Sequence, residues 1–176
     1  VYVPFELLFL GELWTFSEPP LTNIPWWSLG YEAWYYLLFA LAFFYRGLKR
    51  GVLLTAGIVL AGPKLALLLP TWVLGALIWR HRERCPLPRG VARALLAGTV
   101  VAYLAYKSSG LEHSFVVLGN APFGGLDVTP LGSAKSWVHD WLVAAIAGVH
   151  LHALGHAHVG LPRFSVRPIR WFASFT

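Results

Sequence analysis

The chain has 176 residues, of which 57% are hydrophobic and only 12% are charged. A soluble domain carries about 25% charged residues and needs them to cover its surface, so this composition argues against a soluble, disordered or coiled-coil protein. Lys and Arg exceed Asp and Glu by 14 to eight, and the single cysteine excludes an internal disulfide. Nine Trp, seven Tyr and eleven Phe residues are typical of a chain that lies largely in a bilayer.

Apolar segments recur along the chain at about the 20 residues that a membrane span needs. They predict an all-α fold, a polytopic transmembrane bundle of about five complete or partial spans with one more cut off at the C-terminus. We interpret the first segment, 1–14, as the end of a span and the last, from residue 170, as the start of a span. In chain order the predicted spans cover residues 1–14, 28–45, 51–79, 91–106 and 136–157, and the partial one begins at residue 170.

The segment 51–79 is too long for one ordinary span, and Gly62, Pro63 and Lys64 interrupt it. If it forms two short helices in a hairpin, eleven of the 14 basic residues lie on one side of the membrane and three on the other. Lys and Arg are concentrated in cytoplasmic loops, so this sorting favours the hairpin, and a single kinked span is the alternative. It also explains the basic charge without nucleic acid, because no basic patch or binding motif is present.

The longest stretch without apolar character, 107–135, contains several Gly and Pro residues. We predict an irregular loop there, outside the membrane. Met is absent even at position 1, and both ends of the sequence fall in apolar runs. We therefore interpret residues 1–176 as part of one integral membrane domain, the central to C-terminal portion of a longer protein.

Ionisable residues inside spans are costly, so each one is a candidate for function. Glu32 lies about one turn into the second span, where it either stabilises the helix start or holds a reacting group. Asp140, next to His139, either pairs with another helix or faces a polar cavity that binds substrate. Near the end of the span 136–157, four histidines lack a carboxylate or cysteine at ligand spacing, so we predict no metal site: His150, His152, His156 and His158.

The segment 27–38 resembles the signature of the acyltransferase family 3 integral membrane proteins, which acylate lipopolysaccharide, peptidoglycan and other glycans. The family pattern is Trp-Ser-Leu, two residues, Glu, three residues, Tyr and Leu-Leu. The chain matches it at Trp27, Ser28, Leu29, Glu32, Tyr36, Leu37 and Leu38. Two weaker similarities follow in the family's order, at residues 72–76 and at residues 170–176, where Ser174 or Thr176 stands for a family serine.

The resemblance implies an O-acyltransferase that moves an acyl group, expected to be acetyl, from cytoplasmic acyl-CoA to a hydroxyl of an extracytoplasmic glycan or glycosylated small molecule. It implies a multi-pass protein of the bacterial inner membrane that contacts the lipid bilayer, uses acyl-CoA as a co-substrate, binds a carbohydrate or glycolipid acceptor and holds no cofactor. In the family a histidine proposed as catalytic lies in earlier helices. We therefore expect the 176 residues alone to lack transferase activity.

The resemblance also suggests roles for individual residues. Glu32 is the catalytic candidate, because it can orient the expected histidine or bind the attacking hydroxyl. Phosphates of acyl-CoA attract arginines of cytoplasmic loops, although such cations also set the topology; the candidates are Arg46, Arg50, Arg80 and Arg82. The residues expected to contact the acceptor are Trp27, Ser28, Tyr36, Asp140 and Ser174.

A transporter or flippase-like membrane protein without transferase chemistry is the alternative. In that protein, Glu32 and Asp140 would line a substrate or proton path. Many transporters contain an internal repeat, and none is visible in this sequence. The acyltransferase is therefore the interpretation that we favour.

Overall fold

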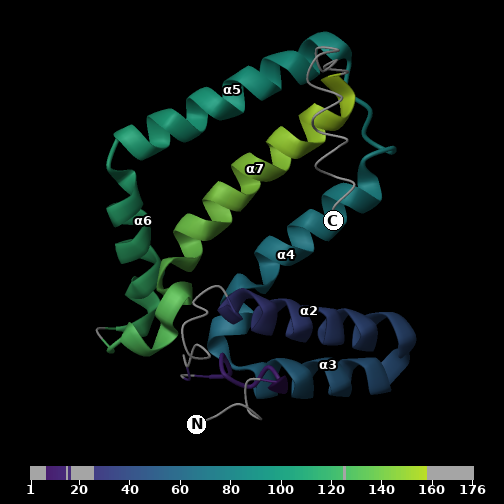
Figure 1. Ribbon diagram of the computed structural model, residues 1–176, viewed down its shortest axis with the longest axis vertical. Coiled ribbons are helices and arrows are strands. Elements are labelled where there is room, and N and C mark those ends of the chain that lie inside the picture. The colour runs from purple at the N-terminus through teal and green to yellow at the C-terminus, as the bar shows by residue number, and fades with distance from the viewer. Residues whose placement is uncertain (1–6, 15, 17–25, 125, 158–176) are drawn as a thin grey trace.

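The protein is all-α in the computed structural model, which describes residues 7–14, 16, 26–124 and 126–157 (Figure 1). The described residues form six α-helices and two 3₁₀-helices, with the short helices η1 and η2 between α6 and α7. Their bounds are α2 Trp26–Phe44, α3 Gly47–Ala61, α4 Pro63–His81, α5 Arg89–Ser108, α6 Leu111–Asn120, η1 Ala121–Phe123, η2 Thr129–Ser136 and α7 Trp137–Ala157.

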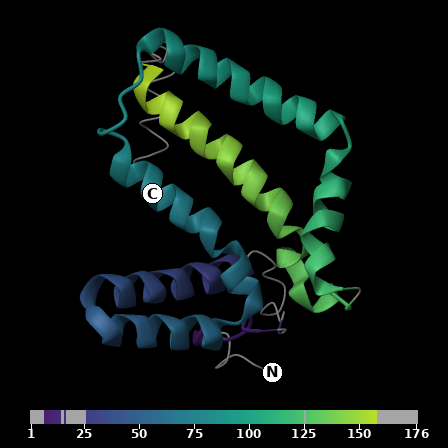
Figure 2. The ribbon, with the colours of Figure 1, turned by 180° about the vertical axis from the view of Figure 1, so that it is seen from behind.

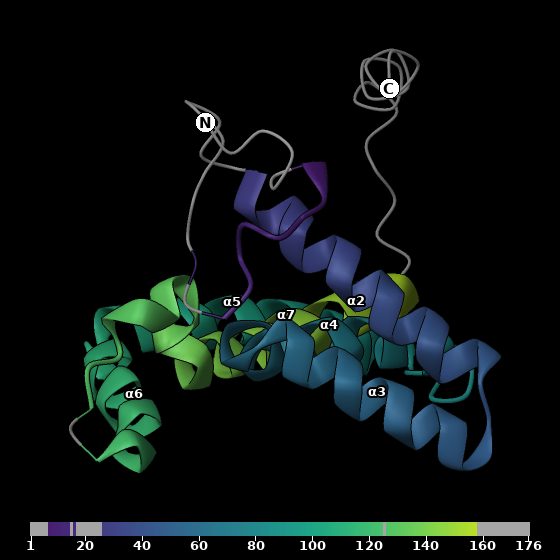
Figure 3. The same cartoon turned by 90° about the horizontal axis from the view of Figure 1, so that it is seen from below.

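Helices α4, α5 and α7 form one layer (Figure 3), and the pair α2–α3 packs beside α4 at the edge of this layer (Figure 1). Seen from behind, α6 joins the end of α5 to the region where α7 begins (Figure 2). Helices α4 and α7 run in the same direction, as two contacts show: residues near the start of α4 contact the start of α7, and residues just after α4 contact the end of α7. Trp141 Nε1 donates to Leu67 O at 2.8 Å, and His152 Nε2 donates to Cys85 O at 2.9 Å.

The break between α3 and α4 is a bend of 119° at Gly62. Gly62 has φ 86°, a left-handed conformation that L side chains rarely adopt, and a Cβ there would lie 2.7 Å from Trp14 Cα. Pro63 follows at the first position of α4, where a missing N–H costs no helical hydrogen bond. Segment 51–79 therefore forms parts of two helices, and its course as a hairpin or as one bent span stays a prediction.

Each predicted span between residues 28 and 157 corresponds to one of the long helices or to the α3–α4 pair. Judged by length and composition, none of the described helices alone is long and apolar enough to cross a membrane. Only α3 and α4 together meet that requirement, as one bent pair.

The N-terminal segment corrects the prediction of a span over residues 1–14, because residues 7–14 form turns rather than a continuous helix. Phe9 and Trp14 have positive φ angles, 56° and 52°, which a helix does not allow. The segment folds over the α3–α4 break, where Trp14 N donates to Ala61 O at 3.3 Å. Glu12 and Lys64 then form a buried ion pair of 2.7 Å, and that pairing outweighs the helical tendency of the apolar run.

The region 107–135 also differs from the irregular loop that we predicted, because it contains the ten-residue helix α6 and most of η2. Gly110 starts α6 from a left-handed conformation, φ 70°, and Pro122 follows its end. Helix α6 packs against the start of α7 at Gly119, whose carbonyl accepts a hydrogen bond from Trp137 Nε1 at 3.0 Å. The Gly and Pro residues therefore mark helix boundaries and not a structureless segment.

The core that positions the candidate site joins α2, α3 and α4. Its buried side chains are Tyr31, Tyr35, Leu38, Ala61 and Leu65. Trp72 of α4 packs against this cluster, with its ring 6.0 Å from that of Tyr35. The face of α2 that carries Tyr31 and Tyr35 is therefore fixed against α4.

Candidate functional site: a hydroxyl-lined pocket between α2, α4, η2 and α7

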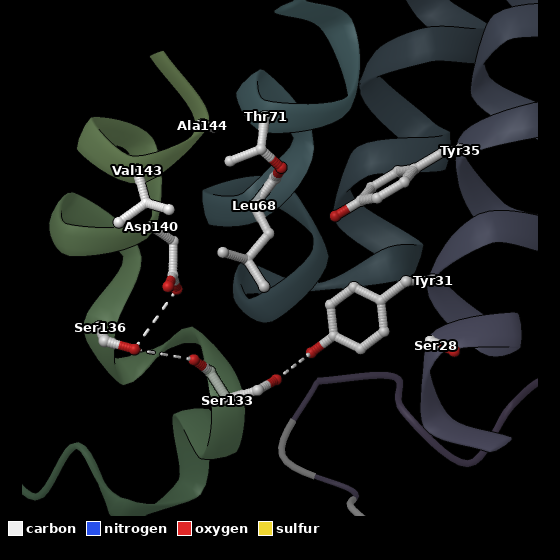
Figure 4. A pocket seen from close by; sticks show the side chains of 10 residues that line it. All are labelled: Ser28, Tyr31, Tyr35, Leu68, Thr71, Ser133, Ser136, Asp140, Val143 and Ala144. Carbon is white, nitrogen blue, oxygen red and sulfur yellow. Dashed lines mark hydrogen bonds between the residues drawn. The ribbon is translucent and has the colours of Figure 1, made fainter. Parts of the chain in front are cut away.

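A pocket of about 460 Å³ lies where α2, α4, η2 and α7 meet, and ten residues line it (Figure 4). We call it the hydroxyl pocket, because six of these residues carry a hydroxyl group: Ser28, Tyr31, Tyr35, Thr71, Ser133 and Ser136. Asp140 supplies one carboxylate, and Leu68, Val143 and Ala144 supply apolar surface. A mainly apolar cavity with a few placed polar groups is the usual form of a small-molecule site.

Helical spacing brings these side chains to one place. Ser28, Tyr31 and Tyr35 are three and four residues apart on α2, so they share one face of that helix. Ser133, Ser136 and Asp140 have the same spacing, across the end of η2 and the first turn of α7. Of our predicted acceptor residues, Ser28 and Asp140 are the two that the structure brings together here.

Five of the hydroxyl residues were missed by the sequence reasoning: Tyr31, Tyr35, Thr71, Ser133 and Ser136. The signal that was present is the repeated spacing of three and then four residues, which ends in the carboxylate of Asp140 in the second set. We predicted a loop up to residue 135 and a span from residue 136, so the pattern was not extended across that boundary. A search for polar residues at helical spacing on either side of Asp140 would have found the two serines.

One hydrogen bond connects the opposite walls of the pocket, and a second lies within the wall formed by η2 and α7 (Figure 4). The hydroxyls of Tyr31 and Ser133 lie 3.2 Å apart, although 102 residues separate them in sequence. Ser136 Oγ donates to Asp140 Oδ2 at 3.3 Å and lies 3.4 Å from Ser133 O. The Tyr31–Ser133 bond therefore connects α2 to η2, and the Ser136–Asp140 bond connects the end of η2 to the first turn of α7.

Two further hydroxyls on the α2 and α4 walls donate to backbone carbonyls. Tyr35 Oη donates to Leu65 O at 3.0 Å, and Thr71 Oγ1 donates to Leu68 O at 2.6 Å. Each hydroxyl has one proton, so these oxygens are left with acceptor positions only. Burial of Tyr31 and Tyr35, each 5% exposed, holds both side chains in one orientation.

The catalytic candidate Glu32 does not line this pocket. It is exposed on the neighbouring face of α2, where Tyr36 Oη donates to Glu32 Oε1 at 2.9 Å. Tyr36 in turn packs its ring edge-on against Trp72 of α4, with the centroids 5.9 Å apart. Two of the motif residues, Glu32 and Tyr36, thus form a pair beside the hydroxyl pocket and not inside it.

A second pocket, of about 450 Å³, lies toward the C-terminal ends of α4 and α7. We call it the basic pocket, because its polar lining includes Arg82, His152 and His156. The guanidinium of Arg82 stacks over the Trp79 ring at 3.6 Å and lies 3.6 Å from the Glu83 carboxylate. Gly75 and Gly155 face open space there, since a Cβ at either position would meet nothing within 4 Å.

The other predicted residues lie elsewhere. Arg46 and Arg50 are exposed at the start of α3, and Arg80 is exposed near the end of α4, so of the four arginines Arg82 is the one that lines a pocket. Ser174 and the side chain of Trp27 lie outside the described residues. In the part of the chain that the structure describes, no three His, Cys, Asp or Glu residues are placed to hold a metal ion.

A group of charged residues joins α5, α6 and α7, and its Lys107 and Glu112 lie outside the predicted spans. Lys107 and Glu112 form an exposed ion pair, and Glu112 Oε1 lies 4.0 Å from His139 Nε2. The hydrogen bond from Lys107 lowers the pKa of Glu112 and raises the pKa of Lys107. Nearby, hydrogen bonds from Thr129 lower the pKa of Asp127.

Comparison with family models, with curated proteins and with solved structures gives no match to this chain. The functional argument therefore depends on the sequence motif and on the geometry of the two pockets.

Proposed function

We propose that this chain is part of a multi-pass integral membrane O-acyltransferase, similar to the acyltransferase family 3 proteins. The observation that carries the proposal is the motif of residues 27–38, which α2 presents beside a pocket. Its Ser28 lines the hydroxyl pocket, and its Glu32 and Tyr36 form a hydrogen-bonded pair on the adjoining face.

The distribution of basic residues supports the proposed membrane orientation. Five arginines lie between the end of α4 and the first turn of α5: Arg80, Arg82, Arg84, Arg89 and Arg93. Lys107 and Lys135 lie at the other end of α5 and next to the start of α7. The arginine-rich end is the cytoplasmic one under the positive-inside rule, so the hydroxyl pocket faces the outer side of the bacterial inner membrane.

In this orientation the two pockets suit the two substrates. The hydroxyl pocket opens near the outer side, where a glycan or glycosylated small molecule would present its hydroxyl. The basic pocket lies near the cytoplasmic side, where acyl-CoA is available. Arg82 can bind a CoA phosphate, and the Trp79 ring offers a stacking surface for its adenine.

The reaction joins the acceptor oxygen to the acyl carbon as the carbon–sulfur bond of the thioester breaks. The attacking hydroxyl gives its proton to a base, and the departing CoA sulfur takes up a proton. A histidine held by a carboxylate is suited to accept the hydroxyl proton. Glu32 is exposed beside the pocket, so it can orient a histidine that approaches α2, and Tyr36 fixes its carboxylate.

The test is acyl transfer in membranes of cells that express the whole reading frame. Glu32→Gln keeps the size of the side chain and its bond to Tyr36 but removes the charge, so we expect loss of acyl transfer with normal expression. Glu112→Gln, at a partly exposed carboxylate of α6 that lines neither pocket, is the matched control and should remain active. Wild-type activity of the Glu32→Gln protein would remove Glu32 from the mechanism.

A transporter is the second candidate, and the α3–α4 break favours it. Broken helices with charges at the break are common in transport sites, and the buried Glu12–Lys64 pair lies at this bend. Uptake of labelled glycosides into proteoliposomes, without acyl transfer, would support the transporter and contradict the enzyme.

A further inference from the structure

The hydroxyl pocket is richer in hydrogen-bond acceptors than in donors, because three of its six hydroxyls already give their protons to other groups of the protein. Tyr35 and Thr71 give their only side-chain protons to backbone carbonyls, at 3.0 and 2.6 Å. Ser136 gives its proton to Asp140, whose ionised carboxylate accepts but cannot donate. A ligand that satisfies these four oxygens must therefore bring several donors of its own.

The charge of the pocket restricts the ligand further. Asp140 is the single carboxylate among the described lining residues, and no Lys, Arg or His is among them. The nearest candidate for a counter-charge on α4, Lys64, is fully buried and already paired with Glu12 at 2.7 Å. His139 lies next to Asp140 in sequence, but its ring contacts Tyr106 and Glu112. A ligand with its own carboxylate or phosphate would therefore meet the charge of Asp140 and several acceptor oxygens, with no cation in the pocket lining to offset the repulsion.

The apolar part of the lining accounts for the rest of the ligand surface. Leu68, Val143 and Ala144 form it, beside the rings of Tyr31 and Tyr35. A sugar ring has hydroxyl donors around its edge and C–H groups on its faces, so it matches both parts of the wall. An aliphatic amine also donates hydrogen bonds, but its donors lie at one point and leave some of the pocket's acceptors unsatisfied. A polyol carries donors around its ring and can satisfy both Asp140 and the hydroxyl oxygens.

We propose that the hydroxyl pocket binds a neutral sugar through the sugar's own hydroxyl donors, and that it rejects sugars that carry a carboxylate or phosphate. The inference rests on the proposed function, since it specifies the acceptor of that transferase. Ser136 and Asp140 are the residues that set this specificity.

The test is binding of matched glycosides to the 176-residue chain in phosphatidylcholine nanodiscs, which carry no sugar headgroup. Saturation-transfer NMR compares the methyl glycosides of glucose, galactose, mannose and rhamnose with methyl glucuronide, methyl galacturonide, permethylated methyl glucoside and methyl glucosaminide. We expect signal from at least one neutral glycoside, and at least tenfold weaker binding of the uronides and of the permethylated glucoside, which has no donors.

Variants connect this selectivity to the pocket. Asp140→Asn is expected to lower the affinity for the neutral glycoside about tenfold. It should also reduce the ratio of the affinity for the neutral glycoside to that for the uronide. Ser136→Ala, which removes one acceptor and disturbs the fold little, should weaken the neutral glycoside by a smaller factor. Glu112→Gln, a carboxylate outside the pocket, is the control and should change neither affinity.

Each other outcome overturns the inference. These outcomes are no signal from any neutral glycoside, equal binding of neutral glycoside and uronide, tighter binding of the glucosaminide, or an unchanged ratio in Asp140→Asn. The proposed function is separable from this result. Selective sugar binding without acyl transfer by the whole reading frame would contradict the transferase alone, and transfer onto an anionic acceptor would contradict the inference alone.

Discussion

At the N-terminal end of the parallel α4–α7 pair, the polar groups are hydroxyls, a carboxylate and a buried ion pair. At the C-terminal end they are an exposed arginine, two histidines and a tryptophan. The first set is held by internal hydrogen bonds, between Tyr31 and Ser133 and from Ser136 to Asp140. In the second set Arg82 keeps a side chain that is 45% exposed. One end is thus preorganised, and the other presents a charge that a ligand from solution can reach.

Helix direction accounts for part of this difference. Because α4 and α7 run in the same direction, their N-termini meet at the hydroxyl pocket and their C-termini at the basic pocket. Helix dipoles favour anions near N-termini and cations near C-termini. Asp140 lies in the first turn of α7, and Arg80 and His81 lie in the last turn of α4. Two helices therefore stabilise opposite charges at their two ends.

The largest effect is expected from breaking the buried ion pair. Lys64→Met leaves the Glu12 carboxylate buried without a partner, and loss of one member of such a pair costs about 3–5 kcal/mol. Unfolding followed by near-UV circular dichroism in nanodiscs measures this free energy. Lys64→Met combined with Glu12→Leu should recover most of the loss. A single variant as stable as the wild type would show that the N-terminal end is not held by this pair.

A bulky residue at the contact between α4 and α7 should destabilise the packing that both pockets share. A Cβ on Gly148 of α7 would lie 2.6 Å from Ile78 Cδ1 of α4, so Gly148→Leu overpacks the contact and should cost about 1–3 kcal/mol. Gly98 of α5 meets nothing within 4 Å, which makes Gly98→Leu the control without a clash. Equal stability of the two leucine variants would argue against close packing of α4 on α7.

These two predictions also separate what the sequence could predict from what it could not. Helix positions follow from apolar length and from Gly and Pro, so the long helices and the break at Gly62–Pro63 were predicted. The reversal of residues 7–14 depends on Glu12 meeting Lys64 across 52 residues, and no local pattern contains that contact. Ser28 and Asp140 were predicted for different reasons, and only the tertiary structure shows that they line one pocket.

The third prediction concerns the basic end alone. Arg82→Ala should weaken binding of free CoA by about tenfold, because a hydrogen bond to a charged group is lost, and should change stability by less than about 0.5 kcal/mol. Calorimetric titration with CoA measures the first, and glycoside binding should be unaffected. Arg84→Ala is the control, since Arg84 is exposed and lines neither pocket. An equal loss in both variants would indicate general charge attraction and not a pocket.

The smallest effect is expected at the exposed pair of Lys107 and Glu112, which is the counterpart of the buried pair at α4. The pKa of Glu112 is lowered in the folded protein, mainly by its hydrogen bond from Lys107. Its contribution to stability is therefore present above the ordinary glutamate pKa of about 4.3 and is lost as the pH falls through the lowered value.

Comparing the melting temperatures of wild type and Glu112→Gln from pH 7 to pH 3 isolates this contribution. We expect a slight difference at pH 7 that disappears at the acidic end, because solvent screens an exposed pair. Asp127→Asn gives a second exposed carboxylate with a lowered pKa for comparison. A difference between wild type and Glu112→Gln as large as that of Lys64→Met would mean that burial does not decide the strength of these pairs. The difference between the preorganised N-terminal end and the solvent-facing C-terminal end of the α4–α7 pair would then be supported by the two pockets alone.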